Sequence, residues 1–189
     1  MNANRPKFSR PEFSRPEFSR PEFSRPEFSR IVPLAQLGSE PFRQEMAATE
    51  AEREALARRF DLLGLDRLAA EVELIRQGSG VILLNASFEA AFVQSCAVTL
   101  DPVEGAMAAN FALRYGPPDT ESEDGAGDGP AFEPLTGDFI DIGEAVAQEF
   151  SLALPSFPRS PGAVLEIEKP PADAGPFAAL SRLTDRQDR

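Results

Sequence analysis

The stretch from Gly80 to Tyr115 constrains the fold of this chain more than any other part. It carries no charged side chain before Glu89, and apolar, partly β-branched residues recur through its first half. Its last six residues, Asn-Phe-Ala-Leu-Arg-Tyr, place a large apolar side chain at every second position, which is typical of a half-buried strand. A turn cluster at Asp101–Gly105 separates the two halves. The stretch therefore predicts neighbouring strands in the middle of an antiparallel sheet.

The segment before this stretch predicts one helix and one strand. Thr49 followed by Glu52 forms a capping box, so we expect a helix that begins there and ends near Leu63, before Gly64. Residues 71–76 alternate polar and apolar side chains and predict a strand, which a tight turn at residues 78–80 joins to the central stretch.

A second amphipathic helix is expected after the central stretch. Asp141 and Glu144 have the spacing of another capping box, and Pro155 is placed to end the helix. Ile142, Val146 and Phe150 fall on one face of this helix. The sequence thus predicts an α+β domain with a mainly antiparallel sheet, open or partly closed into a barrel, and two amphipathic helices.

The N-terminal thirty residues are dominated by a pentapeptide repeat. Residues 5–29 read Arg-Pro-Lys-Phe-Ser once and Arg-Pro-Glu-Phe-Ser four times, and Arg30 begins a copy that breaks off. Proline at every fifth position interrupts both helices and sheet ladders, so we expect a disordered arm over residues 1–30. This arm either presents a multivalent Phe- and Arg-containing motif or is an expanded short sequence without an added role.

Charge is distributed unevenly along the chain. The formal net charge is −12, with a net of +3 over residues 1–30 and −15 over residues 31–170. An acidic body of this kind repels phosphate backbones and suits a basic partner. The segment at residues 116–134 is rich in acids and glycine, so we expect a flexible acidic loop there, within a domain spanning residues 31–170 and followed by a tail at 171–189.

The residue types present exclude several kinds of site. The chain has no histidine, so it lacks the commonest general base and the usual Ser-His and Cys-His pairs. Its single cysteine, Cys96, cannot build a structural zinc site, and on an apolar strand it is most simply a small core residue. The acidic loop fails the ligand spacing of an EF-hand in both registers that place a glycine correctly. We therefore expect a non-enzymatic protein with no catalytic residues, no metal and no cofactor.

Several separate segments resemble one bacterial family. Residues 94–103, with Cys96, are similar to the central motif of the YceD family, the large ribosomal RNA subunit accumulation proteins. Residues 141–155, 157–163 and 175–180 resemble further segments of that family, in the same order and spacing. Many members carry paired cysteines in two of these segments, whereas this chain keeps only Cys96, so a metal site does not carry over. The candidate signature positions are Cys96, Thr99, Leu100, Pro102, Asp141, Gly143, Glu144, Arg159, Pro161 and Gly162.

The resemblance implies a role in the synthesis, processing or stability of large-subunit (23S) ribosomal RNA, and hence in ribosome biogenesis in the bacterial cytoplasm. The partner would be a pre-ribosomal large-subunit particle or a basic ribosomal or assembly protein. The alternative is an acidic chaperone or adaptor that holds one basic protein. We expect no direct RNA binding by the acidic core, no exported leader and no membrane span, since no apolar run reaches the necessary length.

Overall fold

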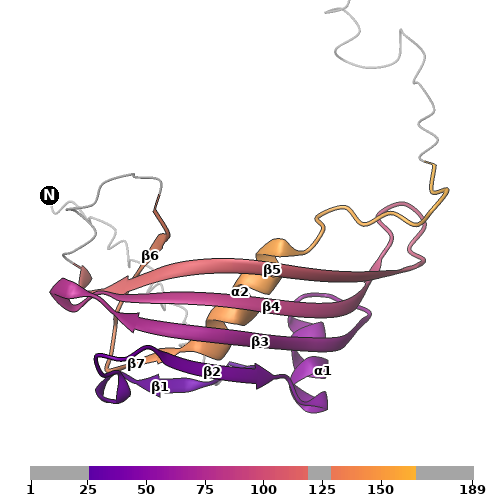
Figure 1. Ribbon diagram of the computed structural model, residues 1–189. Coiled ribbons are helices and arrows are strands. Elements are labelled where there is room, and N and C mark those ends of the chain that lie inside the picture. Colours follow the sequence, from indigo (N-terminus) through magenta and orange to yellow (C-terminus); the bar gives the residue numbers. More distant parts are fainter. Residues whose placement is uncertain (1–25, 119–128, 165–189) are drawn as a thin grey trace, which may run out of the picture.

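A computed structural model describes residues 26–118 and 129–164 of the chain (Figure 1). The helices are α1 (Glu50–Arg59) and α2 (Ile142–Ala153), with short 3-10 turns at Leu34–Gln36 and Gly78–Gly80. The strands are β1 (Ile31–Pro33), β2 (Phe42–Ala47), β3 (Gly64–Arg76), β4 (Ile82–Ser95), β5 (Pro102–Gly116), β6 (Ala131–Pro134) and β7 (Phe139–Asp141).

Most strands belong to one sheet with the order β2-β3-β4-β5-β6. The pairings from β2 to β5 are antiparallel, and β6 adds in parallel to the end of β5. A separate antiparallel ribbon joins β1 to β7. The α+β class with a mainly antiparallel sheet is confirmed, and the described strands form an open sheet that does not close into a barrel.

One face of the sheet is buried because the strands alternate. In β4 the even-numbered residues from Ile82 to Phe92 are buried, whereas the odd-numbered residues between them are half-buried or exposed. The buried face packs against α2, which runs diagonally across it in Figure 1. The Phe150 ring lies 5.9–6.2 Å from the rings of Phe60, Phe88 and Phe92 and joins α1, α2 and the sheet into one core.

The first helix begins as the sequence predicts but ends earlier. The Thr49 hydroxyl accepts from the Glu52 N–H, and Glu52 reaches back to the Thr49 N–H, so the capping box is confirmed. The helix ends at Arg59, not near Leu63, because Asp61 takes a left-handed conformation (φ 54°). The Leu63 N–H then bonds the Val93 carbonyl, which brings the chain to the sheet.

Two expected loops are partly strand. The turn between the central strands lies at residues 96–101, and residues 102–105 are already in β5, so the turn placed at Asp101–Gly105 was wrong. The acidic segment at 116–134 is also shorter than expected, because β5 includes Gly116 and residues 131–134 form β6. Residues 119–128 within it lie outside the described residues, as do residues 1–25 and 165–189, including the tail.

The last copy of the repeat belongs to the folded body. Phe28 is fully buried, although we placed the boundary between arm and domain at residue 30. Residues 26–30 are therefore part of the folded body, and the earlier copies lie outside the described residues. Neither α1 nor α2 is long and apolar enough to cross a membrane.

Candidate functional site

The candidate signature positions gather in two clusters, and the first surrounds Cys96 at the turn between β4 and β5. The fully buried Cys96 Sγ accepts from the N–H groups of Val98, Thr99 and Ser160 at 3.4–3.5 Å. The Ser160 hydroxyl lies 3.5 Å from the same sulfur, and the Ala97 N–H bonds the Pro158 carbonyl at 2.8 Å. The fold thus brings residues 94–103 and 157–163 together, which sequence spacing alone did not predict.

The remaining members of this cluster shape the two backbone segments. Leu100 takes a left-handed conformation (φ 64°) and is 76% exposed, and its N–H bonds the Cys96 carbonyl. Pro102 begins β5, and Gly162 also has a positive φ of 84°. Arg159 and Pro161 flank Ser160 and are exposed. Hydrogen bonds to Thr99 and Ser160 lower the pKa of the Cys96 thiol, and burial of the sulfur opposes this shift.

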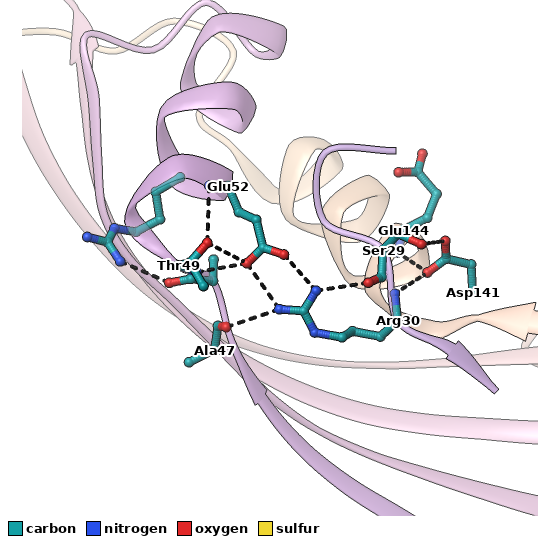
Figure 2. A network of polar contacts seen from close by, with 9 residues as sticks. Ser29, Arg30, Ala47, Thr49, Glu52, Asp141 and Glu144 are labelled. Atoms are coloured by element: carbon teal, nitrogen blue, oxygen red, sulfur yellow. Dashed lines mark hydrogen bonds and ion pairs between the residues drawn. The ribbon is translucent and has the colours of Figure 1, made fainter. Parts of the chain in front are cut away.

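The second cluster lies at the start of α2 and holds the last repeat copy (Figure 2). Asp141 is the N-cap, and its carboxylate accepts from the Glu144 N–H at 3.2 Å. The same carboxylate accepts from the Arg30 N–H at 2.7 Å and from the Ser29 hydroxyl at 2.6 Å. The expected capping box is only half present, because the Glu144 side chain pairs with Arg59 at 2.7 Å instead of reaching back.

Gly143 is needed for the close approach of this copy. A Cβ atom at position 143 would lie 2.4 Å from the Phe28 carbonyl oxygen and 2.9 Å from the Arg30 nitrogen. Both atoms belong to the backbone, so a side chain could be accommodated only if the segment moved away. Asp141, Gly143 and Glu144 therefore have a structural role in this fold.

Arg30 completes the second cluster by joining the repeat copy to α1. Its guanidinium bonds both carboxylate oxygens of Glu52 at 2.6 and 3.0 Å and lies 4.7 Å from the centre of the Phe28 ring. The bond from Arg30, assisted by the backbone and hydroxyl of Thr49, lowers the pKa of Glu52 to about 2.

The open face of the sheet is the surface best suited to a partner, and both described helices lie on the other side. Residues from four strands line up across this face, because the antiparallel registers place them directly opposite each other. One row is Glu45, Glu71, Ser87 and Asn110, and the next is Ala47, Ala69, Glu89 and Ala108. Because the alanine and serine side chains in these rows are short, the middle of the open face is recessed, and carboxylates flank it.

Two shallow hollows follow from this arrangement. One, of about 650 Å³, lies over the strand centres and is lined by Glu45, Arg67, Glu71 and Glu89 around alanine and serine residues. The other, of about 720 Å³, adjoins it and includes Arg43, Glu73 and two asparagines. A broad, shallow surface of small side chains can accept an extended or flat partner segment.

The charges on the open face are unbalanced. Arg43 pairs with Glu73 at 2.7 Å and Arg67 pairs with Glu89 at 2.9 Å. Glu45 and Glu71 face each other directly across β2 and β3, and neither forms an ion pair with another described residue. Like charges directly opposite each other on neighbouring strands destabilise a sheet. A cationic group of a partner would relieve this repulsion, so the two carboxylates are suited to binding one.

Sequence reasoning did not identify these open-face residues. The alternation in residues 71–76 already predicts that Glu71 and Glu73 share the outer face of their strand. That Glu45 lies opposite Glu71 depends on a register between strands 26 positions apart in the chain, which no local pattern reports. Among the described residues, no group of three or more Asp, Glu or Cys side chains is placed to hold a metal ion.

The fold and this face define an acidic α+β domain with one helix-covered and one open sheet face. Within it, the model of the family described as large ribosomal RNA subunit accumulation protein YceD matches residues 84–182. The match covers more than half of the chain and runs from β4 through α2, so the chain belongs to the YceD family. The resemblance noted in the sequence is confirmed. No curated protein and no solved structure matches the chain.

Proposed function

We propose that this protein is a non-catalytic factor for the accumulation of large-subunit (23S) ribosomal RNA, acting in ribosome biogenesis in the cytoplasm. Membership in the YceD family supports this proposal, because the family description names large ribosomal RNA subunit accumulation. The absence of histidine from the chain and the placement of its one cysteine in a buried turn support a binding role in place of catalysis.

The protein would act through the open face, and its direct partner would be a protein. The acidic side chains on this face are Glu45, Glu71, Glu73, Glu89 and Glu104, and the basic ones are Arg43, Arg67 and Arg114. The excess of carboxylates repels the phosphate backbone of RNA. It attracts a positively charged protein segment, and electrostatic steering raises the rate of such an encounter.

A second candidate is an acidic adaptor that holds one basic ribosomal protein away from the particle. Glu45 and Glu71, which form no ion pair within the described part of the chain, favour this reading, because they offer two carboxylates at one point of the shallow hollow. A lysine or arginine side chain inserted between them would relieve their mutual repulsion.

A pull-down of the tagged protein from its own cells, at low and high salt, separates the two candidates. The assembly-factor proposal predicts co-purification of large-subunit precursor RNA together with ribosomal proteins. Recovery of a single basic protein without RNA, lost at high salt, would favour the adaptor. Recovery of neither would contradict both.

A matched pair of variants tests whether the open face is the contact surface. Glu45→Gln with Glu71→Gln removes two negative charges from the face, and we expect at least a tenfold loss of the captured partner at low salt. Glu50→Gln with Glu54→Gln removes the same charge from the exposed surface of α1 and should leave capture unchanged. Equal effects of the two variants would show that overall charge, not this face, governs binding.

A further inference from the structure

The fifth copy of the pentapeptide repeat occupies a site that is built from two parts of the chain that are distant in sequence. Phe28 is fully buried and Ser29 is 9% exposed, although both belong to a repeat that has a proline at every fifth position. The residues that surround them come from α1 (Glu52 and Arg59) and from the start of α2 with its N-cap (Asp141, Gly143 and Glu144). We call these five residues the repeat site.

Glu27 and Ser29 of the copy, and Arg30 directly after it, each have a partner in the repeat site. Glu27 pairs with Arg59 at 3.0 Å, and Ser29 donates to Asp141 at 2.6 Å. Arg30 bonds Glu52 through its guanidinium, and Asp141 through its backbone N–H. The site therefore contacts the two charged side chains and the hydroxyl of the sequence Glu-Phe-Ser-Arg, and the Phe28 ring of that sequence is buried.

The chain contains the same sequence three more times. Glu-Phe-Ser-Arg recurs at residues 12–15, 17–20 and 22–25, each time after Arg-Pro, as it does at residues 27–30. The first copy differs at one position, because Lys7 stands where the others have glutamate. Since Arg59 contacts that position in the occupied site, the first copy would place two positive charges together.

We propose that the repeat site binds the Glu-Phe-Ser-Arg sequence as such, so that an upstream copy of the same chain occupies it when the fifth copy is released. A shift by one repeat places Phe23, Ser24 and Arg25 where Phe28, Ser29 and Arg30 lie. Residues 26–30 then loop out before β1. The entropy cost of closing a flexible loop grows only slowly with its length, and the upstream copy offers the site the same side chains.

Strand β1 explains why the fifth copy holds the site in the structure. Ile31–Pro33 follow it without a linker and pair with β7, and Val32 is 2% exposed. The fifth copy thus docks without a loop between the site and β1, whereas each upstream copy can dock only if the residues between it and β1 form a loop. The upstream copies should therefore bind the site less strongly than the fifth copy, and the copy with Lys7 should bind it least.

Thermal unfolding of three full-length variants tests the proposal. Replacing the four upstream phenylalanines by alanine (Phe8, Phe13, Phe18 and Phe23) should leave Tm unchanged. Replacing all five should lower Tm by roughly 10 °C, as expected for emptying a buried aromatic site. Phe28→Ala alone should lose less than half of that, because an upstream phenylalanine fills the site. Equal losses for Phe28→Ala and the five-fold variant would overturn the proposal.

The same measurements identify where the replacement copy comes from. If it comes from the same chain, Phe28→Ala should elute as a monomer-sized species whose Tm does not depend on protein concentration. A Tm that rises with concentration, together with a larger species, would mean that the arm of a second chain docks, and would overturn the same-chain proposal.

Synthetic hexapeptides provide an independent test on the five-fold variant. Arg-Pro-Glu-Phe-Ser-Arg should raise its Tm in a saturable manner, Arg-Pro-Lys-Phe-Ser-Arg should require a higher concentration, and Arg-Pro-Glu-Ala-Ser-Arg should have no effect. Adding Asp141→Asn should weaken the response to the first peptide. Equal responses to all three peptides would contradict sequence recognition. If the five-fold variant does not fold, a folded Phe28→Ala variant still supports the proposal. A Phe28→Ala variant that also fails to fold would overturn it.

Discussion

Alanine at position 143 should destabilise the protein, although glycine-to-alanine changes in helices usually stabilise. In an exposed helix the change gains up to about 1 kcal/mol. Here the new Cβ would lie 2.4 Å from the Phe28 carbonyl oxygen, so the repeat copy must leave or α2 must shift. Losing the burial of Phe28 costs about 3–5 kcal/mol, and the net loss is therefore about 2–4 kcal/mol.

Chemical denaturation followed by circular dichroism measures this loss, and thermal unfolding should show a Tm lower by about 5–15 °C. Gly38→Ala is the matched control, because a Cβ there meets no atom within 4 Å. In the variant without the five arm phenylalanines, Gly143→Ala should cost much less, since the site is already empty. A neutral or stabilising Gly143→Ala in the full chain would refute the argument that backbone approach requires this glycine.

Three further predictions concern other contacts. The pKa of Glu52 is lowered from 4.5 to about 2, so this carboxylate stabilises the fold fully above pH 4.5 and loses that effect as the pH falls through 2. In urea titrations, Glu52→Gln should cost about 1 kcal/mol at pH 7 and much less at pH 2, and an equal cost at both would contradict this. Gly105→Ala should cost about 1–3 kcal/mol, because its Cβ would lie 2.6 Å from the buried Phe92 ring, and an unchanged denaturation midpoint would show that the ring moves freely. Cys96, fully buried, should react with a thiol reagent only at the rate at which the turn opens, and immediate labelling in native buffer would argue against the buried turn.

The repeat copies show most clearly where sequence reasoning reaches its limit. Phe23 and Phe28 are preceded by the same residues for several positions and are both followed by Ser-Arg, so no local pattern singles out Phe28 as the one that belongs to the core. The signal that was available is the direct join of Arg30 to Ile31 and Val32, which leaves no linker between repeat and strand. A strand that starts without a linker holds the preceding residues close to the fold.

The sequence-based prediction placed the turn between β4 and β5 too late in the chain for a related reason. Pro102 and Gly105 are strong local turn residues, yet both lie in β5. The pairing of Phe92 with Gly105 explains the difference, because the aromatic ring covers the position that lacks a side chain. Leu100 takes the left-handed conformation instead, held by its bond to Cys96.

The sequence by itself determined the local features of this protein. The period-two strands, the N-cap residues Thr49 and Asp141, and the end of α2 before Pro155 all depend on neighbours within a few residues, and they were predicted correctly. The tertiary structure alone decided three features: the hydrogen bond from Ser160 to Cys96, the facing carboxylates of Glu45 and Glu71 on the open face, and the docking of the last repeat copy. Those features join residues that are 26 to 112 positions apart in the chain, and only the packing of the whole sheet sets their register.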